Sequence, residues 1–344
     1  MLDLIVEKTK EYLSIPAVVG HERFFMEHLY ADFKALGCEV YKYDGLLLVQ
    51  GAQPFSNIVC AHIDRHGLIS LGDNEYVYAA QYIREIKYGE NNKSSRALVQ
   101  SIAQRFEGET VYAYHPDTGV HIAEGVIEAC YPDMRNDDAL FEVEGILSLE
   151  HNIPLAYARQ ATFEDGLLKG QIDNVISVAV CYALCKAGYQ GTMLLTCEEE
   201  IGKSWIHIAE YLKNSYIDTK RLIVIDTSPY SDLEFIETGP IVFRKRDKNA
   251  VFNDAFSEVL RQRAELLGLP YEFKDEMLLA RGKEVSDLGC TELGRLVENT
   301  EGHWNGATVQ IPTLMYHTSN ETTTEKAIRD YYIFLHNTLI QNPV

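Results

Sequence analysis

The sequence predicts an α/β protein, with a mixed, largely parallel sheet flanked by helices and a small β-rich domain inserted into it. Short apolar strands alternate with amphipathic helices in the first and last parts of the chain, the pattern of a sheet covered on both faces. Between these parts, glycine, aspartate and proline break the chain into short strands. With 344 residues, 46% of them hydrophobic, the chain can build a core for each part.

The first part predicts two helices followed by strands. Apolar residues recur at helical spacing over 2–14 and 22–37, and Gly37 is a suitable helix stop. The stretches "CEVYKYDGLLLVQG" (38–51) and "NIVCAHID" (57–64) have the composition of strands. The second of these strands ends on a histidine and an aspartate.

The middle of the chain predicts a separate β-rich unit. Stretches such as "TVYAYH" and "GVHIAEGVIEA" indicate short strands between turns. We therefore expect residues 71–162 to form an inserted domain, and residues 1–70 and 163–344 to form one discontinuous α/β domain.

The last part returns to alternating strands and helices. "TMLLTC" and "RLIVID" predict buried strands, and "AFSEVLRQRAELLG" (255–268) predicts a helix. The stretch "TTTEKAIRDYYIFLHNTLI" predicts a closing helix, with Thr322 and Glu325 as a capping box at its start.

Composition excludes several classes of function. The formal charge of −20 argues against binding to nucleic acid or to an anionic membrane surface. No stretch reaches the length of a membrane span, and the N-terminus lacks the pattern of a secretory signal, so we expect a cytoplasmic protein. The seven cysteines show no disulfide or zinc-ribbon spacing and are interpreted as packing residues.

Acidic residues and histidines follow the predicted strands one after another. They comprise His62 and Asp64, the run Glu198, Glu199 and Glu200, then Asp226 and His317, with Asp173 just before a long apolar stretch. Ligands gather at the carboxyl ends of strands in such sheets. Each piece alone also fits a simpler interpretation: a strand-end histidine with a surface aspartate, a solvated acidic loop, or, for Asp173, a helix N-cap.

Taken together, two histidines and at least four carboxylates suit borderline divalent metals such as Zn²⁺, Co²⁺ or Mn²⁺. The set exceeds what one tetrahedral ion needs. A pair of ions about 3.5–4 Å apart, bridged by a carboxylate, would use it fully and leave one glutamate as a base.

Six motifs, in order along nearly the whole chain, resemble one known family. They are "LSIPAVVGHE", "AHIDRHG", "LLKGQIDN", "EEIG", "IVIDTSPYSD" and "IPTLMYHTSNE". The sequence resembles the tetrahedral and glutamyl aminopeptidases, family forty-two of the metallopeptidases, which also contains proteins once labelled endoglucanases. The resemblance implies a zinc-peptidase-like fold, two divalent metal ions per subunit, short peptides as substrates, and a homo-oligomer from dimer to dodecamer assembled through the inserted domain.

The resemblance also implies a role for each matched residue. Asp173 would bridge the two ions, His62 and Asp226 would complete one site, and Glu200 and His317 the other. Glu199 would be the general base, and Asp64 would orient His62. The implied reaction is hydrolysis of the N-terminal peptide bond of a peptide.

Several positions depart from the family pattern. Arg65 and His66 stand where an acidic residue usually follows the His-x-Asp motif, and we expect them to bring positive or titratable charge near the site. Val175 and Leu314 lie at two further altered positions. His66 could be a further ligand or a substrate contact, although a partly exposed strand-end histidine is the simpler interpretation. Glu198 is interpreted as a solvated residue or one that supports a ligand from behind. Asp287 fits either a helix cap or a contact with the substrate amine.

Three functions remain open at the level of sequence. A metallo-aminopeptidase is the leading hypothesis, a metal-dependent amidohydrolase or deacylase is the second, and a catalytically silent metal-binding scaffold is the third. The presence of Glu199 argues against the third, because a structural metal site needs no base. The sequence does not set the preferred N-terminal residue of the substrate.

Overall fold

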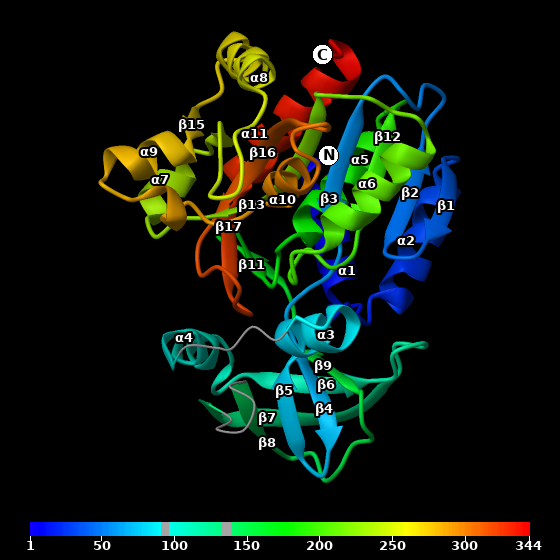
Figure 1. Cartoon of the computed structure of the whole chain (residues 1–344), viewed down its shortest axis with the longest axis vertical. Helices are drawn as coiled ribbons and strands as arrows, with labels where there is room; N and C mark the ends of the chain where they lie inside the picture. Colours follow the sequence, from blue (N-terminus) through cyan, green and yellow to red (C-terminus); the bar gives the residue numbers. More distant parts are fainter. Residues whose placement is uncertain (91–95, 133–138) are drawn as a thin grey trace.

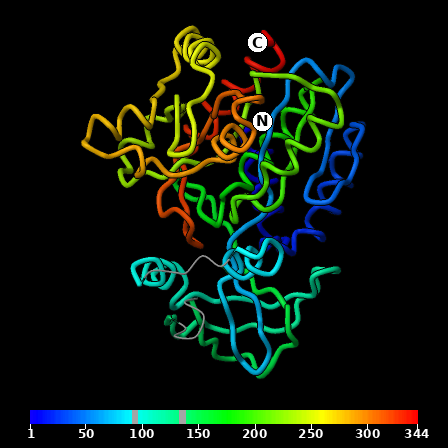
Figure 2. Tube along the Cα trace, in the orientation of Figure 1, coloured from blue at the N-terminus to red at the C-terminus, as the bar shows by residue number. Residues whose placement is uncertain are grey.

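The computed structural model describes residues 1–90, 96–132 and 139–344. The chain forms an α/β part built on one large sheet and, below it in Figure 1, a smaller part built on a closed barrel. Both termini lie in the α/β part (Figure 2). The predicted fold class, a mixed sheet flanked by helices with a small β-rich insertion, is confirmed.

The large sheet has eight strands, and its centre is parallel. Strands β12, β3, β13 and β16 run parallel to one another, while β2 and β14 add antiparallel neighbours on either side. In spatial order the strands are β1 (Glu39–Tyr43), β2 (Leu46–Gln50), β12 (Thr192–Thr196), β3 (Ile58–His62), β13 (Leu222–Pro229), β16 (Gly306–Thr313), β14 (Ile241–Arg244) and β15 (Tyr271–Phe273).

Helices cover both faces of this sheet, because alternate strand residues point to opposite sides. Val59 and Ala61 of β3 face one core with helices α1 (Leu2–Leu13), α2 (Arg23–Ala35), α5 (Val175–Lys186), α8 (Asp254–Leu266) and α11 (Glu325–His336). Ile58 and Cys60 face the other core, with α6 (Ser204–Asn214) and α10 (Glu292–Asn299). Shorter helices, α7 (Leu233–Glu237) and α9 (Lys274–Ala280), lie near the edge strands β14 and β15 (Figure 1).

Helix α5 is apolar all round, and its residues from Val175 to Leu184 are almost all buried. A helix with this composition is stable only inside a core. Packing in the core therefore fixes the position of its N-terminus against the sheet, and Asp173 lies just before that end. The bond between Asp173 and Asn174 is cis.

The smaller part is a closed antiparallel barrel of six strands with its own core. The strands, in spatial order, are β4 (Leu68–Gly72), β5 (Glu75–Tyr78), β8 (Ala139–Glu144), β7 (His121–Pro132), β6 (Thr110–Tyr114) and β9 (Pro154–Tyr157). Helices α3 (Ala79–Tyr88) and α4 (Arg96–Phe106) accompany it, which the strand patterns did not predict. Domain limits at 70 and 162 stay a prediction, whereas the barrel strands occupy residues 68–157.

A third, three-stranded sheet joins distant parts of the chain. It contains β10 (Thr162–Glu164), β11 (Leu167–Gly170) and β17 (Glu321–Thr324). The predicted capping box at Thr322 is wrong, because Thr322 belongs to β17 and α11 begins three residues later. Thr324 is the N-cap, and its side chain accepts a hydrogen bond from Ala327 N. None of the described helices is both long and apolar enough to cross a membrane.

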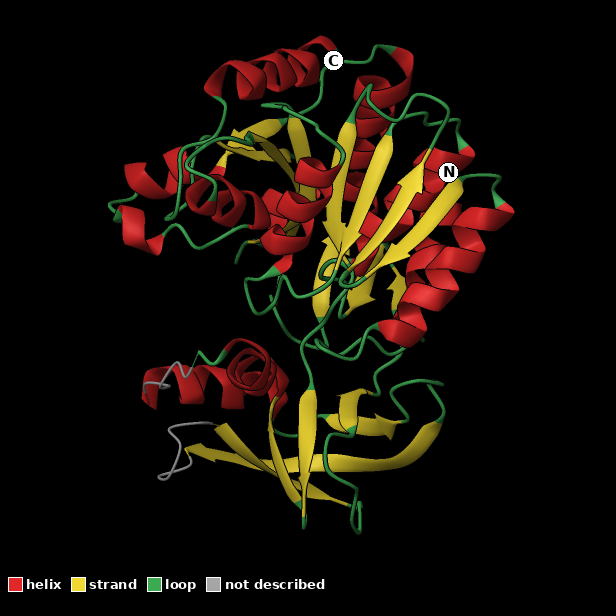
Figure 3. Ribbon diagram, turned by 45° about the vertical axis from the view of Figure 1, so that its right-hand side comes forward, coloured by secondary structure: helices red, strands yellow, loops and turns green. Residues whose placement is uncertain are grey.

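The carboxyl ends of the parallel strands face the barrel. Only five residues separate the end of β3 at His62 from the start of β4 at Leu68. Figure 3 shows the arrowheads of the central strands pointing toward the smaller part. Side chains that follow these strands therefore gather between the two parts of the molecule.

Candidate metal centre

The five predicted metal ligands converge at the carboxyl ends of the parallel strands, in two groups. The His62 group contains His62, Asp173 and Asp226, and the His66 group contains His66, Glu200 and His317. Within each group, one ligand atom from each residue lies within 4.8 Å of the others. A tetrahedral ion with bonds of about 2.0–2.1 Å keeps its ligand atoms roughly 3.3 Å apart, so both groups are of the right size for a metal ion.

Asp173 lies between the two groups and faces both. Its Oδ1 is 3.2 Å from His62 Nε2, and its Oδ2 is 3.5 Å from His317 Nε2. Oδ1 is buried and has no aligned hydrogen-bond partner. Asp173 does not cap α5, because the helix begins after Asn174 without a side-chain cap. Each oxygen is thus available to a different ion, as a bridging carboxylate requires.

The remaining ligands come from separate elements. His62 ends β3 and Asp226 lies within β13, with 3.4 Å between His62 Nε2 and Asp226 Oδ1. Glu200 lies in the turn after β12, and His317 in the loop between β16 and β17, with 3.8 Å between their nearest N and O atoms. Only the folded sheet brings these positions together.

Burial and mutual repulsion dominate the electrostatics of the carboxylates. Burial and the Asp173 charge raise the pKa of Glu200 well above its usual range, and they also raise the pKa of Asp226. Burial likewise raises the pKa of Asp173, but its close contacts with His317 and His62 outweigh burial and leave that pKa lowered. Buried carboxylates this close to one another need cations to remain ionised. The donor set of imidazoles and carboxylates therefore fits Zn²⁺ or Co²⁺.

The pKa values of His62 and His317 are shifted in opposite directions. Burial lowers the pKa of His62, but the carboxylates of Asp173 and Asp226 outweigh it and hold the pKa well above its usual range. Burial lowers the pKa of His317, and its contacts with Asp173 do not fully compensate. Bound cations would replace the proton that His62 otherwise carries among these carboxylates.

Glu199 lines the same cavity as the ligands. Burial and the Asp226 carboxylate, partly offset by His62, raise the pKa of Glu199 to about 8. Its strongest charged neighbours therefore belong to the His62 group. A carboxylate with a pKa near neutrality is suited to take and return a proton.

Asp64 fixes the turn that carries the glutamates. Its two carboxylate oxygens accept hydrogen bonds from Glu199 N at 3.1 Å and Glu200 N at 3.0 Å. The Nδ1 atom of His62 is 3.2 Å from the backbone oxygen of Asp64 and 3.6 Å from its Oδ1. Asp64 thus contacts His62 chiefly through its carbonyl and uses its carboxylate on the neighbouring turn.

Glu321 is a buried residue of the site that the sequence interpretation missed. Its carboxylate accepts hydrogen bonds from Asp173 N at 2.7 Å and His317 N at 2.6 Å, which ties two ligands of different groups together. Its spacing of four residues from His317, at the end of "HTSNE", was the available signal.

Two expectations about the altered positions are wrong. His66 is buried, with 4% of its surface exposed, and lies in a ligand group. Arg65 brings no charge to the site, because its guanidinium donates to the backbone oxygens of Leu13 and Ile15 and lies over the Phe25 ring. Side chains of neighbouring residues point in opposite directions here, as in a strand.

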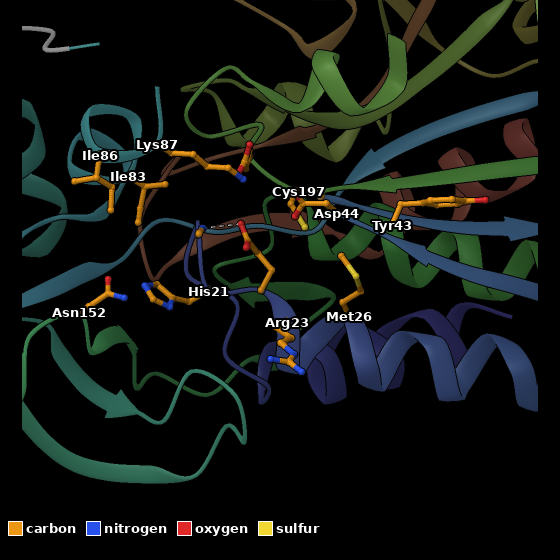
Figure 4. A pocket seen from close by; sticks show the side chains of 14 residues that line it. His21, Arg23, Met26, Tyr43, Asp44, Ile83, Ile86, Lys87, Asn152 and Cys197 are labelled. Atoms are coloured by element: carbon orange, nitrogen blue, oxygen red, sulfur yellow. Dashed lines mark hydrogen bonds and ion pairs between the residues drawn. The ribbon is translucent and has the colours of Figure 1, made fainter. Parts of the chain in front are cut away.

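Glu198 is also buried, rather than solvated. Its carboxylate contacts Lys87, Tyr88 and His207, and their hydrogen bonds outweigh burial and lower its pKa to about 2. It faces a second pocket, of about 480 Å³, between the α/β part and the barrel. Figure 4 shows Lys87 extending into this pocket from α3, and Arg23 and Met26 from α2. Glu198 is therefore separate from the ligand groups.

The cavity beside the ligands, of about 570 Å³, has a cationic wall. Arg244 and Lys274 are both 4% exposed, and both donate to neutral oxygens. Arg244 donates to Gln310 Oε1 and Leu288 O, and Lys274 donates to Ser228 Oγ and Pro229 O. Burial and Arg244 lower the pKa of Lys274 well below its usual range. Asp287 also lines the cavity, and its carboxylate accepts a hydrogen bond from Glu284 N, as a helix cap does.

A third cluster of possible ligands, Glu11, His28 and Asp32, lies on the outer surface of α1 and α2. These residues already pair with Lys8 and with one another. This cluster is not part of the site.

Comparison with known proteins identifies the fold. No family model and no curated protein sequence matches the chain. Among solved structures, an aminopeptidase from the archaeon Desulfurococcus kamchatkensis is similar over 98% of this chain and 95% of its own, with a TM-score of 0.73 at 15% identity. A TET aminopeptidase from a marine-sediment thaumarchaeon is similar over 99% of this chain and 97% of its own, with a TM-score of 0.74 at 13% identity.

A third structure is the TET1 peptidase of Pyrococcus horikoshii, which assembles into a tetrahedron or a large octahedral shell. It is similar over 97% of this chain and 99% of its own, with a TM-score of 0.70 at 15% identity. The chain thus has the fold of the TET aminopeptidases, the group that its motifs resemble.

Proposed function

We propose that the protein is a dinuclear metal-dependent aminopeptidase, which removes the N-terminal residue from short peptides. The observation that carries the proposal is the position of Asp173, whose two oxygens face two separate ligand groups. A single ion would leave one of these groups without a use. The shared fold with TET aminopeptidases supports the same function.

The residues of the chain divide the chemistry between them. The His62 group and the His66 group would each hold one divalent ion, Zn²⁺ or Co²⁺, with Mn²⁺ also compatible. When bound, such ions supply a water of lowered pKa and polarise the scissile carbonyl. Glu199 takes the proton of the attacking water and delivers it to the leaving amine nitrogen. Asp64 holds Glu199 in place, because its carboxylate accepts a hydrogen bond from the backbone N–H of Glu199.

We further propose a preference for substrates whose first residue is acidic. Arg244 and Lys274 are buried basic side chains at the cavity wall, and both donate to neutral oxygens rather than to a described carboxylate. Buried charges are stable when paired, so an incoming carboxylate would complete them. Arg105 and Arg295 line the same cavity as further basic side chains.

The inserted barrel is proposed to mediate homo-oligomer assembly. The motif resemblance and the assembled state of the TET1 peptidase support this proposal. A cytoplasmic location stays a prediction of the sequence.

Hydrolysis of aminoacyl p-nitroanilides tests the function. Protein stripped of metal and reloaded with Zn²⁺, Co²⁺ or Mn²⁺ is expected to turn over, with the glutamyl substrate preferred to the leucyl and lysyl ones. The variant Glu199→Gln is expected to bind both ions and to lose about 10²–10⁴-fold in kcat, the usual contribution of a general base.

Each other outcome identifies an alternative. Turnover of N-acyl amino acids but of no anilide would indicate a deacylase. Metal binding without turnover on either panel would indicate a silent scaffold. Equal rates on acidic and basic anilides would refute the proposed preference while leaving the aminopeptidase intact.

A further inference from the structure

His66 presents a buried nitrogen that no described residue satisfies with a hydrogen bond. Its Nε2 lies 2.8 Å from Glu200 Oε2, yet the two are not aligned for a hydrogen bond, and Nε2 has no hydrogen-bond partner in the described structure. Its ring lies edge-on to that of His317, with centroids 4.2 Å apart. A nitrogen and an oxygen this close, without the alignment of a hydrogen bond, suit two ligand atoms directed at one cation.

The other side of the His66 ring is fixed. Nδ1 lies 2.7 Å from the hydroxyl of Tyr78, at the end of β5, and the backbone oxygen of His66 accepts a hydrogen bond from Gln171 Nε2 at 3.0 Å. If Nδ1–H donates to the Tyr78 oxygen, the lone pair of Nε2 is free to face Glu200. Metal-binding histidines commonly donate their second ring N–H in this way.

We infer that His66 is a fourth protein ligand of the ion held by Glu200, His317 and Asp173, through its Nε2 atom. This inference rests on the proposed function, since it concerns one of the two ions. The set predicted from sequence for that ion contained one histidine, whereas the structure supplies two.

The inference gives the two ions different numbers of protein ligands. Four protein ligands fill a tetrahedral site, which is typical of tightly held ions, whereas His62, Asp173 and Asp226 leave a fourth position open to water. Glu199 lines the cavity beside both groups. The His66 group would therefore retain its ion, while the His62 group would keep a position for water. A site with two imidazoles also favours Zn²⁺ or Co²⁺ over Mn²⁺.

A crystal structure of the zinc-loaded protein tests the ligand directly and needs no variant. The expected result is a second ion with His66 Nε2 about 2.0–2.1 Å away, the length of a Zn–N bond. An ion bound by Glu200 and His317 with His66 Nε2 beyond 3 Å of it would overturn the inference, roughly a whole ångström outside bonding range. Absence of both ions would instead overturn the proposed function.

A Co²⁺ titration of metal-stripped protein tests the same point in solution. Wild type is expected to bind two ions, with the strong visible absorption of four-coordinate Co²⁺ appearing at the first equivalent. In His66→Phe, the tighter of the two ions is expected to weaken by at least the roughly 10–100-fold that loss of an outer-sphere partner causes, and its absorption to fall as water replaces the imidazole.

The variant His28→Phe is the matched control. His28 belongs to the surface cluster on α2, away from both groups, and its replacement is expected to leave both affinities and the spectrum unchanged. Thermal unfolding of each metal-free variant checks that the fold is kept. Identical titrations of His66→Phe and wild type would show that His66 is no ligand.

Discussion

At the scale of single residues, neighbours in the sequence have unrelated tasks. Arg65 packs against backbone carbonyls of the α1 end, while His66 turns to the metal centre. In the run of three glutamates, Glu198 pairs with Lys87 in a separate pocket, whereas Glu199 and Glu200 face the ligands. A motif therefore indicates which reactive side chains a segment contains, but the direction of each side chain decides what it contacts.

The bridging position of Asp173 gives a prediction at this scale. Asp173→Asn is expected to lose both ions, because the amide offers only one oxygen to two ligand groups that share it. Asp226→Asn is expected to lose only the ion of the His62 group. Metal content per chain after dialysis distinguishes the two variants. Retention of both ions by Asp173→Asn would show that the carboxylate does not bridge.

At the scale of elements, turns and helix ends position the site more than the strands do. The apolar α5 fixes the depth of Asp173, and Glu321 of β17 holds the backbone of Asp173 and His317 together. Asp64, at the end of β3, accepts both N–H bonds of the turn after β12. The Asp64 carboxylate thus links the ends of the adjacent parallel strands β3 and β12 beside the candidate ligands.

The variant Asp64→Asn tests this link. Its amide NH₂ would face one of the two backbone donors, so we expect a loss of about 1.5–3 kcal/mol in the free energy of unfolding, the cost of a charge-assisted hydrogen bond. Asp73→Asn is the control, since Asp73 is exposed in a turn at φ 50°, a conformation that Asn adopts equally well. Urea denaturation measures both. Equal midpoints for the two variants would show that Asp64 is no anchor.

At the scale of the whole molecule, the barrel is part of the site. Tyr78 of β5 contacts His66, and Arg105 of α4 lines the substrate cavity. Arg84 of α3 donates to the backbone oxygen of Ile201, just beyond the glutamate turn. An assembly contact on the barrel would therefore act on elements that reach the metal centre.

Removal of metal gives a prediction for the whole molecule. Buried carboxylates that lose their cations repel one another, so chelated protein is expected to unfold at a lower temperature than the zinc-loaded form. Zn²⁺ at 100 times its Kd would contribute about 2.7 kcal/mol per site. Differential scanning calorimetry measures the shift, which Asp173→Asn should largely abolish. An unchanged unfolding temperature in wild type would argue against a metal centre at these residues.

The sequence by itself determined the fold class, the main helices and strands, and the chemistry at the strand ends. Periodicity and apolar runs are local, so the helices over 2–13 and 23–35 and the strand ending at His62 followed directly from it. The cap of the last helix did not, because pairing with β11 places Thr322 in a strand and makes Thr324 the N-cap of a helix that begins at Glu325.

Only the tertiary structure decided which residues lie in contact at the candidate site. Tyr78 meets His66 from the barrel, twelve residues further along the chain, and Glu321 joins the site from β17, far away in the sequence. Their meeting depends on the close approach of β3, the barrel and β17, which is a property of packing rather than of any segment. The types of candidate ligand could therefore be predicted from the sequence, whereas their division into two groups follows from the fold, because it depends on distances between side chains.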